Sequence, residues 1–376
     1  MRVLQIAQKP QRRGAEVFAA QLGAWLAGTG HEVRHAYLYR YEGPEPLATA
    51  PGDLRFGSDQ DSPLERLPFG NPSLLLALRR EIRRWTPDVV QANGGRSVKY
   101  SSLAAMLSPG RRWKLVYRNI DSPVFWVRGA ARKLYFRHLI MPRIDGVVGV
   151  SRKTLAEVYK LYGLSVPGEF IPNGIDLSSL KDPAERTKVR RDLGVGDQQA
   201  VVLLFGALTA QKRPERFVRL IHRLREADED VVGWVLGDGE VRVAMETQAA
   251  ELGVAGSIRF LGYRKRVADL VAAADFMAST SDSEGIPAAV LEAGYLEVPT
   301  VGYDVGGMRE CVRYGETGYL APPGDEQELL KLALRLVRDP AERRRLGRAS
   351  RSFVADGFSI DAVGRRYEAF FGRVLS

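Results

Sequence analysis

The 376-residue sequence has a single cysteine, four histidines and no apolar run near the length that spans a bilayer. With Cys311 as its single cysteine, the sequence can form no internal disulfide and no metal site built from clustered cysteines. The lack of disulfides is typical of proteins in reducing compartments. Met1 and Arg2 lead directly into a predicted strand, so the sequence shows no apolar core of a secretory signal. We therefore expect a cytoplasmic protein.

The basic excess of the sequence lies in its front half. The net charge is +10, yet residues 1–175 hold 26 Lys and Arg against 14 Asp and Glu, and the remaining residues hold 29 against 31. A concentrated positive charge attracts anionic partners. The candidates are a phospholipid surface, a lipid-diphosphate acceptor, an acidic glycan and nucleic acid, so peripheral contact with the inner face of a membrane is one expectation.

Predicted strands and helices alternate along the chain. Apolar runs predict strands at residues 2–8, 33–39, 88–92, 113–117 and 146–150; helical patterns separate them, with a long aperiodic loop at 42–72. After a Pro172-Asn173-Gly174 turn, typical of a domain boundary, the pattern restarts with a strand at 200–205 and a helix at 215–227. Strands separated by helices predict an α/β protein whose parallel sheets are covered on both faces.

Glu284 and Glu292 stand eight residues apart around a predicted strand end, glycine turn and helix start. An apolar run at 275–280 predicts the strand, and Pro287 suits the first turn of the helix that follows. Glu284 is then expected at the mouth of the loop, and Glu292 about one and a half turns into the helix. The first-turn N–H groups that suit an anionic or hydroxyl-rich ligand are those of Gly285, Ile286, Ala288 and Ala289.

Both glutamates also have a purely structural interpretation, in which Glu284 caps the helix and Glu292 lies on its solvated face. The small and apolar neighbours of Glu292, from Ala288 to Ala293, predict instead that this carboxylate is partly buried. A buried carboxylate needs hydrogen-bond partners, and the vicinal hydroxyls of a ribose would supply them.

At this stretch the sequence resembles a known family. Glu284-Gly285-x-Pro287, closing with Glu292-Ala293, looks like the E-x7-E motif of the GT4 family of retaining glycosyltransferases, which have the GT-B architecture. Further segments resemble family motifs in the family's order, namely Arg13-Gly14-Ala15-Glu16, Pro172-Asn173-Gly174-Ile175-Asp176, Gly206 to Arg213, and Gly306-Gly307-x-x-Glu310. The resemblance spans nearly the whole chain, and its strength lies in order and spacing.

The resemblance implies two Rossmann-like, doubly wound parallel-sheet domains that face a cleft. An acceptor-side domain would span residues 1–174 and be completed by the C-terminal helix at 358–376, and a donor-binding domain would span 175–357. Lys212 and Glu284 would be catalytic. The donor-binding residues that the resemblance implies are Arg13, Gly14, Gly206, Lys212, Arg213, Tyr263, Glu284, Gly285, Ile286, Ala288 and Glu292.

The sequence departs from the family pattern at two places. The arginine that relatives carry after the glycine at position 206 is Ala207 here, so Arg213 or Arg13 would have to supply its charge. Many relatives carry a His-Asp pair after the strand at 113–117, where this chain has no histidine. The acceptor-side candidates expected on this loop are instead Arg118, Asn119 and Asp121.

The resemblance implies transfer of a hexose-type sugar, with retention, from a UDP- or GDP-sugar to a glycan, glycolipid or lipid-linked acceptor in polysaccharide or glycolipid assembly. We expect no cofactor and no metal, because cationic side chains and helix N-termini can stabilise the leaving diphosphate. The pairs Asp59/Asp61 and Asp228/Asp230 resemble metal-binding Asp-x-Asp motifs, but they lie in polar loop stretches rather than at a strand end.

Other hypotheses remain open from the sequence. A nucleotide-sugar epimerase on the same fold would need no acceptor, and a catalytically inactive basic protein would bind anionic glycan or nucleic acid with steep salt dependence. The transferase hypothesis expects no nucleic acid. Residues 125–143 interleave basic and aromatic side chains, which is typical of a helix on an anionic membrane and equally of an amphipathic helix with buried aromatics.

Overall fold

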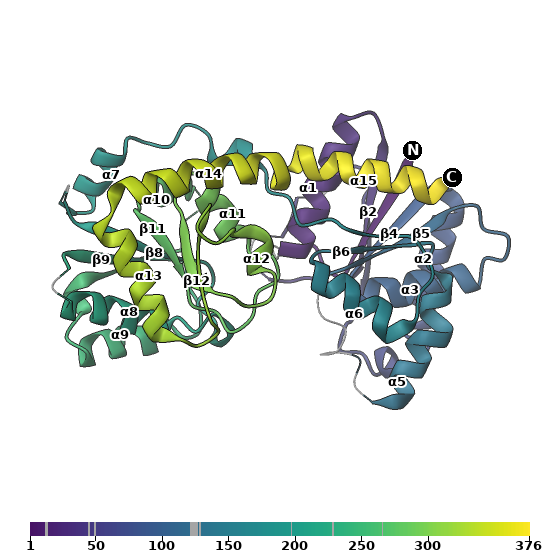
Figure 1. The fold of residues 1–376 in the computed structure, drawn as a ribbon. Coiled ribbons are helices and arrows are strands. Elements are labelled where there is room, and N and C mark those ends of the chain that lie inside the picture. Colours follow the sequence, from purple (N-terminus) through teal and green to yellow (C-terminus); the bar gives the residue numbers. More distant parts are fainter. Residues whose placement is uncertain are drawn as a thin grey trace. The chain divides into compact units, whose positions relative to one another are not determined.

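The computed structural model describes residues 1–11, 14–43, 46–48, 50–120, 127, 129–196, 198–227, 229–264 and 266–376. The chain divides into two compact units (Figure 1). Unit 1 comprises residues 1–174 and 360–376, and unit 2 comprises residues 175–359. Arg13, Asp121 and Asp228, which the sequence analysis singled out, lie outside the described residues.

Unit 1 is built on a seven-stranded parallel sheet with the order β3-β2-β1-β4-β5-β6-β7. Its strands are β1 (Arg2–Ala7), β2 (Glu32–Tyr39), β3 (Leu54–Ser58), β4 (Val89–Asn93), β5 (Lys114–Asn119), β6 (Gly146–Gly149) and β7 (Gly168–Phe170). Val3 of β1 pairs with Val33 on one side and with Val89 on the other. The strand order therefore reverses at β1, as in a doubly wound sheet.

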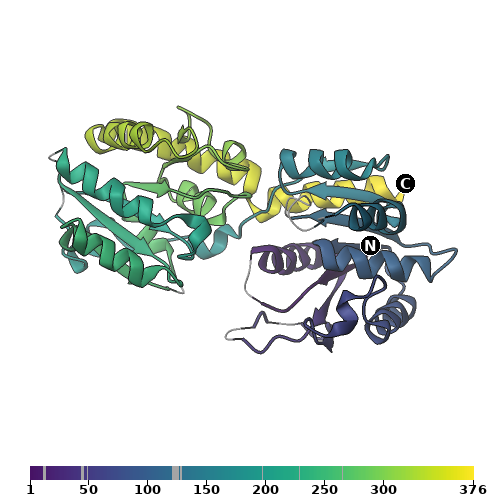
Figure 2. The same cartoon turned by 90° about the horizontal axis from the view of Figure 1, so that it is seen from below.

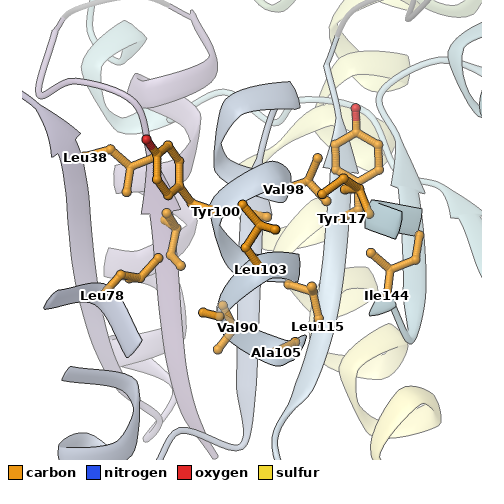
Figure 3. Packing of buried hydrophobic residues seen from close by; sticks show 14 of the residues in the cluster. Leu38, Leu78, Val90, Val98, Tyr100, Leu103, Ala105, Leu115, Tyr117 and Ile144 are labelled. Atoms are coloured by element: carbon orange, nitrogen blue, oxygen red, sulfur yellow. The ribbon is translucent and has the colours of Figure 1, made fainter. Parts of the chain in front are cut away.

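Helices cover both faces of this sheet (Figure 2). They are α1 (Gly14–Gly28), α2 (Pro72–Trp85), α3 (Gly95–Met106), α5 (Ala130–Tyr135), α6 (Arg152–Tyr162) and α15 (Ile360–Leu375). Successive strand residues point to opposite faces: Val89 packs in the cluster of α1 and α15, whereas Val90 packs in the cluster of α2 and α3 (Figure 3). The C-terminal helix is thus part of the core of unit 1.

Unit 2 repeats the design with a six-stranded parallel sheet in the order β10-β9-β8-β11-β12-β13. Its strands are β8 (Ala200–Phe205), β9 (Val231–Leu236), β10 (Ile258–Gly262), β11 (Phe276–Ser279), β12 (Thr300–Tyr303) and β13 (Gly318–Ala321). Its helices are α7 (Arg186–Asp192), α8 (Glu215–Glu226), α9 (Arg242–Glu251), α10 (Ala268–Ala272), α11 (Ala288–Tyr295), α12 (Met308–Cys311), α13 (Glu326–Arg338) and α14 (Pro340–Phe358). The predicted α/β class with two Rossmann-like parallel sheets is confirmed.

One prediction about unit 1 was wrong, and another was confirmed over part of its range. The loop expected at 42–72 contains β3, which pairs with β2 from Ala36↔Leu54 onward, and the 3₁₀ turn Pro63–Arg66. The helix expected at 125–143 is found from Ala130 to Arg143, with α5 continuing directly into a π turn at Phe136–Ile140 and a 3₁₀ turn at Met141–Arg143. Residues 125, 126 and 128 lie outside the described residues. Within the described part of the chain, no helix combines the length and the hydropathy of a membrane span.

Candidate functional site

The candidate site of unit 2 lies where β8, β9 and β11 end. In the sheet, β9 and β11 are the two neighbours of β8, and the strand order reverses at β8. Open α/β sheets bind their ligands at the carboxyl ends of the strands around such a point. Gly206 follows β8 with a φ of 137°, and Gly237 follows β9 with a φ of 138°. A Cβ atom on Gly237 would lie 1.9 Å from the carbonyl oxygen of Gly206, so the two loops meet main chain to main chain.

Lys212 and Glu284 form an ion pair at this edge of the sheet. Lys212 Nζ lies 2.5 Å from Glu284 Oε1, and the Ser281 hydroxyl donates to the same oxygen at 2.6 Å. The Lys212 side chain is 29% exposed and that of Glu284 is 8% exposed. The pair is therefore largely desolvated, with the ammonium group as its more accessible partner.

Hydrogen bonds to main-chain carbonyl oxygens fix the loops that carry this pair. The Thr280 hydroxyl donates to the carbonyl oxygen of Lys212 at 3.1 Å, and the Asp282 N–H donates to the carbonyl oxygen of Gln211 at 3.0 Å. The loop after β11 is thereby tied to the 3₁₀ turn Ala210–Lys212. The sequence motifs around positions 212 and 284 are brought together as a single cluster.

A glycine pair after β12 supports the loop from behind. The Gly307 N–H donates to the carbonyl oxygen of Glu284 at 3.0 Å. A Cβ atom on Gly306, whose φ is 58°, would lie 1.8 Å from that oxygen, and one on Gly307 would lie 2.4 Å from the carbonyl oxygen of Gly285. This support was missed from the sequence, although the Gly306-Gly307 pair was the signal that could have indicated it.

The start of α11 offers main-chain donors beside Glu284. The helix begins at Ala288, and its N-cap Pro287 has no side-chain cap hydrogen bond. Gly285 and Ala288 are exposed, and a Cβ atom on Gly285 would meet nothing within 4 Å. The Ile286 side chain is only 6% exposed, so it serves packing, and only its main chain could reach a ligand.

Glu292 lies on α11 beside a separate cavity of about 460 Å³. Gly206, Gly237 and Tyr263 also bound this cavity, and the Tyr263 side chain is 61% exposed. No hydrogen bond or ion pair reaches the Glu292 carboxylate from the residues that the structure describes. Burial raises the pKa of Glu292 to about 7, because removal of water disfavours the ionised form. A desolvated acid without an internal partner is suited to a ligand that brings hydrogen-bond donors.

The cavity beside Glu292 adjoins the Lys212–Glu284 pair. Gly206 and Ala207 bound it and also bound a smaller cavity that touches Lys212 and Glu284. Arg213 does not bound either cavity. It has a φ of 48° and faces acids of its own unit, with Nε 2.5 Å from Glu215 Oε1. In this structure its charge is directed toward Glu215 and Asp282 and away from both cavities.

The acceptor-side candidates of unit 1 require a correction. Arg118 and Asn119 were expected on an open loop, but they are the last residues of β5 and are 0% and 1% exposed. Pairing of β5 with β6 continues to Asn119, so the strand extends past the predicted end. Arg118 donates to Asn93 Oδ1 at 3.0 Å and to Asn173 Oδ1, and its guanidinium lies 4.4 Å from the centre of the Phe18 ring. Arg118 thus joins segments of the unit 1 interior.

The remaining predicted residues give simpler outcomes. Gly14 is exposed at the first position of α1 in unit 1, where a Cβ atom would meet nothing within 4 Å. Among the described residues, no three His, Cys, Asp or Glu side chains are arranged to hold a metal ion. Asp59 accepts from the Asp61 N–H at 2.9 Å, and Asp230 accepts from Gln199 and Arg225.

Comparison with known proteins places these features in a family. The chain is 26% identical over 232 residues to the N-acetyl-alpha-D-glucosaminyl L-malate synthase of Bacillus anthracis, covering 61% of this chain and 60% of that protein. It is 28% identical over 232 residues to a GDP-mannose-dependent alpha-(1-6)-phosphatidylinositol monomannoside mannosyltransferase of Mycolicibacterium smegmatis, covering 59% and 60%. These matches span about 60% of the length of either relative.

Solved structures share the fold of the whole chain. The crystal structure of Anabaena HepE in complex with UDP has a TM-score of 0.83 at 19% identity, covering 99% of this chain and 100% of the other. Two family models match successive parts of the sequence, Glycosyltransferase Family 4 at residues 12–179 and Glycosyl transferases group 1 at residues 185–353. The chain therefore belongs to the GT4-type glycosyltransferases of the GT-B fold, with a Family 4 domain followed by a group 1 domain.

Proposed function

We propose that the chain is a retaining, metal-independent glycosyltransferase that moves a hexose-type sugar from a UDP- or GDP-sugar to a glycan, glycolipid or lipid-linked acceptor. The observation that carries the proposal is Glu292, a half-buried carboxylate that no hydrogen bond or ion pair from the described residues reaches, on a cavity that adjoins the Lys212–Glu284 pair. The names of relatives add support, since one solved neighbour binds UDP and one relative is GDP-mannose-dependent.

The cavity beside Glu292 fits the nucleoside part of such a donor. The Glu292 carboxylate would accept hydrogen bonds from the two ribose hydroxyls, which a desolvated acid requires. The exposed Tyr263 ring on the same cavity would stack against the base. Gly206 has a φ of 137°, and a Cβ atom there would meet nothing within 4 Å, so a ligand can approach the main chain closely.

The Lys212–Glu284 cluster fits the diphosphate and the sugar. The Lys212 ammonium would pair with the phosphate oxygens and stabilise the charge that develops as the diphosphate leaves. The uncapped main-chain N–H groups at the start of α11 would add donors for the same charge. Glu284 would accept hydrogen bonds from sugar hydroxyls, and a phosphate oxygen of the leaving group would take the proton of the acceptor hydroxyl. This division leaves no step that needs a metal ion.

Thermal melting tests the donor site directly. UDP, GDP and ADP would each be added to the wild type, to Glu292→Gln and to Glu251→Gln, which changes an exposed acid at the end of α9. A ligand at about 100 times its dissociation constant stabilises the folded protein by about 2.7 kcal/mol. We expect one nucleotide to raise the melting temperature of the wild type and of Glu251→Gln but not that of Glu292→Gln. A shift that Glu292→Gln retains in full would contradict the ribose assignment.

Turnover separates the transferase from the other hypotheses. Incubation of the matching nucleotide sugar with acceptor glycans and glycolipids, in buffer with a chelator, should release nucleoside diphosphate and give a product with the donor's anomeric configuration. Equilibration of the nucleotide sugar without any acceptor would instead indicate an epimerase. Absence of nucleotide binding together with salt-dependent binding of polyanions would indicate an inactive binding protein.

A further inference from the structure

Unit 1 has its own large cavity at the carboxyl edge of its sheet. The cavity has a volume of about 970 Å³. Gln8 follows β1, Gly95 begins α3 after β4, and Ile120 follows β5, and all three residues bound it. Its other walls are the 3₁₀ turn Pro63–Arg66 with the residues that follow it, and α5 with the start of the π turn. Parallel α/β sheets bind their ligands at this edge.

The walls of this cavity carry four cations and one carboxylate. The cations are Arg66, Arg96, Lys99 and Arg132. The carboxylate is Glu65, which accepts from the Tyr39 hydroxyl at 2.8 Å and from the Tyr100 hydroxyl at 2.5 Å. Glu65 is thus occupied by neutral donors rather than by a cation. Among the described residues, no carboxylate lies within ion-pair distance of any of the four cations.

The two cations of α3, Arg96 and Lys99, are half-buried and contact neutral groups. Lys99 Nζ donates to the carbonyl oxygen of Leu67 at 3.0 Å, and the Arg96 guanidinium lies 5.4 Å from the centre of the Tyr39 ring. Burial lowers the pKa of Lys99, and the nearby charges of Arg132 and Arg96 lower it further against the opposing effect of Glu65. The cavity therefore has excess positive charge that an anion would relieve.

We propose that this cavity binds a phosphate group of the acceptor, with Arg96 and Lys99 on one wall and Arg66 and Arg132 on the others. The inference rests on the proposed transferase function, because it gives the chemical class of the second substrate. A guanidinium group can donate two parallel hydrogen bonds to two oxygens of one phosphate. Because cations line three walls of the cavity, a phosphate dianion fits it better than a ligand with a single carboxylate does.

Leu67 bounds the cavity, and further exposed apolar side chains lie on the segments that form its walls or directly after them. Leu64 and Leu67 are 42% and 47% exposed on or beside the 3₁₀ turn, Phe69 is 56% exposed two residues further, and Leu134 of α5 is 56% exposed. They would contact an apolar part of the acceptor next to its phosphate. The phosphate could therefore belong to a lipid headgroup or to a small soluble acceptor, and the experiment below distinguishes these sources.

Calorimetric titration with inorganic pyrophosphate tests the cavity. The protein is first saturated with the nucleotide that shifts its melting, so that the proposed diphosphate site of unit 2 is filled. We expect Arg96→Gln/Lys99→Gln to weaken pyrophosphate binding about tenfold or more, as the loss of two charge-assisted contacts implies. The matched control is Arg84→Gln/Lys153→Gln, which removes the same charges from exposed positions on α2 and α6 and should bind like the wild type.

Equal binding by the wild type and by Arg96→Gln/Lys99→Gln would overturn the proposal. Failure of the proposed donor site is recognised from the melting experiment. If no nucleotide raises the melting temperature, or if Glu292→Gln keeps the increase, the result concerns the donor site of unit 2 and not this cavity. Circular dichroism and melting temperatures without ligand show whether the double variant is folded. Should it be misfolded, the single variant Arg132→Gln, on an exposed residue of α5, repeats the titration and must also weaken binding.

Vesicle sedimentation identifies the source of the phosphate. Three proteins are mixed with vesicles of phosphatidylcholine alone or with added phosphatidylglycerol. They are the wild type, the variant Arg96→Gln/Lys99→Gln (the cavity pair) and the variant Arg84→Gln/Lys153→Gln (the control pair). Sedimentation that needs phosphatidylglycerol and is lost only in the cavity pair would assign the phosphate to a lipid headgroup. Cavity-dependent binding of pyrophosphate without such sedimentation would assign it to a soluble acceptor. Binding of neither probe by the wild type would refute the phosphate assignment.

Discussion

Glu292 should make the stability of unit 2 depend on pH in the direction opposite to that of an ion-paired carboxylate. Burial raises its pKa from 4.5 to about 7. The folded form then binds the proton more tightly than the unfolded form, so the free energy of unfolding falls as the pH rises from about 4.5 to about 7. The difference between these pKa values corresponds to a destabilisation of about 3 kcal/mol above pH 7, at about 1.4 kcal/mol per pH unit.

The Glu292→Gln variant tests this magnitude, because glutamine keeps the shape of a protonated glutamate and has no ionisable group. Below about pH 4.5 the variant and the wild type should have similar stability. At pH 8 the variant should be more stable by about 3 kcal/mol, although it no longer binds nucleotide. Urea unfolding at several pH values between these limits measures the difference, with Glu251→Gln as the exposed control.

A stability difference between Glu292→Gln and the wild type that does not change with pH would refute this reasoning. The same ionisation should govern ligand affinity, since ribose hydroxyls donate to the carboxylate rather than to the acid. Nucleotide affinity of the wild type and of Glu251→Gln should therefore decline below pH 7 more steeply than the titration of the nucleotide itself accounts for.

Three further substitutions probe other parts of the structure. Lys212→Gln should lower turnover about 10²–10³-fold in single-turnover assays, because loss of one group that stabilises the leaving charge costs roughly 3–4 kcal/mol. Gly306→Ala should displace the loop that it supports and abolish the nucleotide melting shift, whereas Gly315→Ala, at a similar positive φ with nothing within 4 Å, should keep the shift. Arg118→Met should lower the free energy of unfolding in urea by about 2–3 kcal/mol, because it removes the charged donor that Asn93 and Asn173 share; an unchanged midpoint would contradict its structural role.

Much of the fold could be predicted because its signals are local. The apolar run of β8 gives Ala200–Phe205, the bounds that the structure has. The C-terminal helix expected at 358–376 is α15, which begins at Ile360 and ends at Leu375. The edge strand β3 was missed because its sequence, Leu54–Ser58, is short, contains a glycine and is half-exposed along its length. An edge strand with one neighbour lacks the continuous apolar run that marks a central strand.

The candidate site was predictable where its residues follow a strand and begin a helix, and was not where distant segments meet. The apolar neighbours of Glu292 predict its partial burial, and the structure confirms this prediction, since the residue is half-buried. The partners of Arg118 lie 25 and 55 residues away in the chain, so no local pattern indicates that its guanidinium is buried. The phosphate cavity of unit 1 likewise gathers cations from three separate segments, each of which alone is typical of a solvated surface.

The contact between Gly306 and the carbonyl oxygen of Glu284 has a consequence for engineering. Main-chain contacts with Gly306 and Gly307 support one side of this loop, and the Gln211 and Arg216 side chains donate to its carbonyl oxygens at Ser283 and Thr280. Exposed positions around it, such as Ser283 and Ala288, could be replaced in libraries without displacing the carboxylate or the helix start. Sugar preference could therefore be altered on this scaffold by changing the lining of the site while its supporting main chain stays in place.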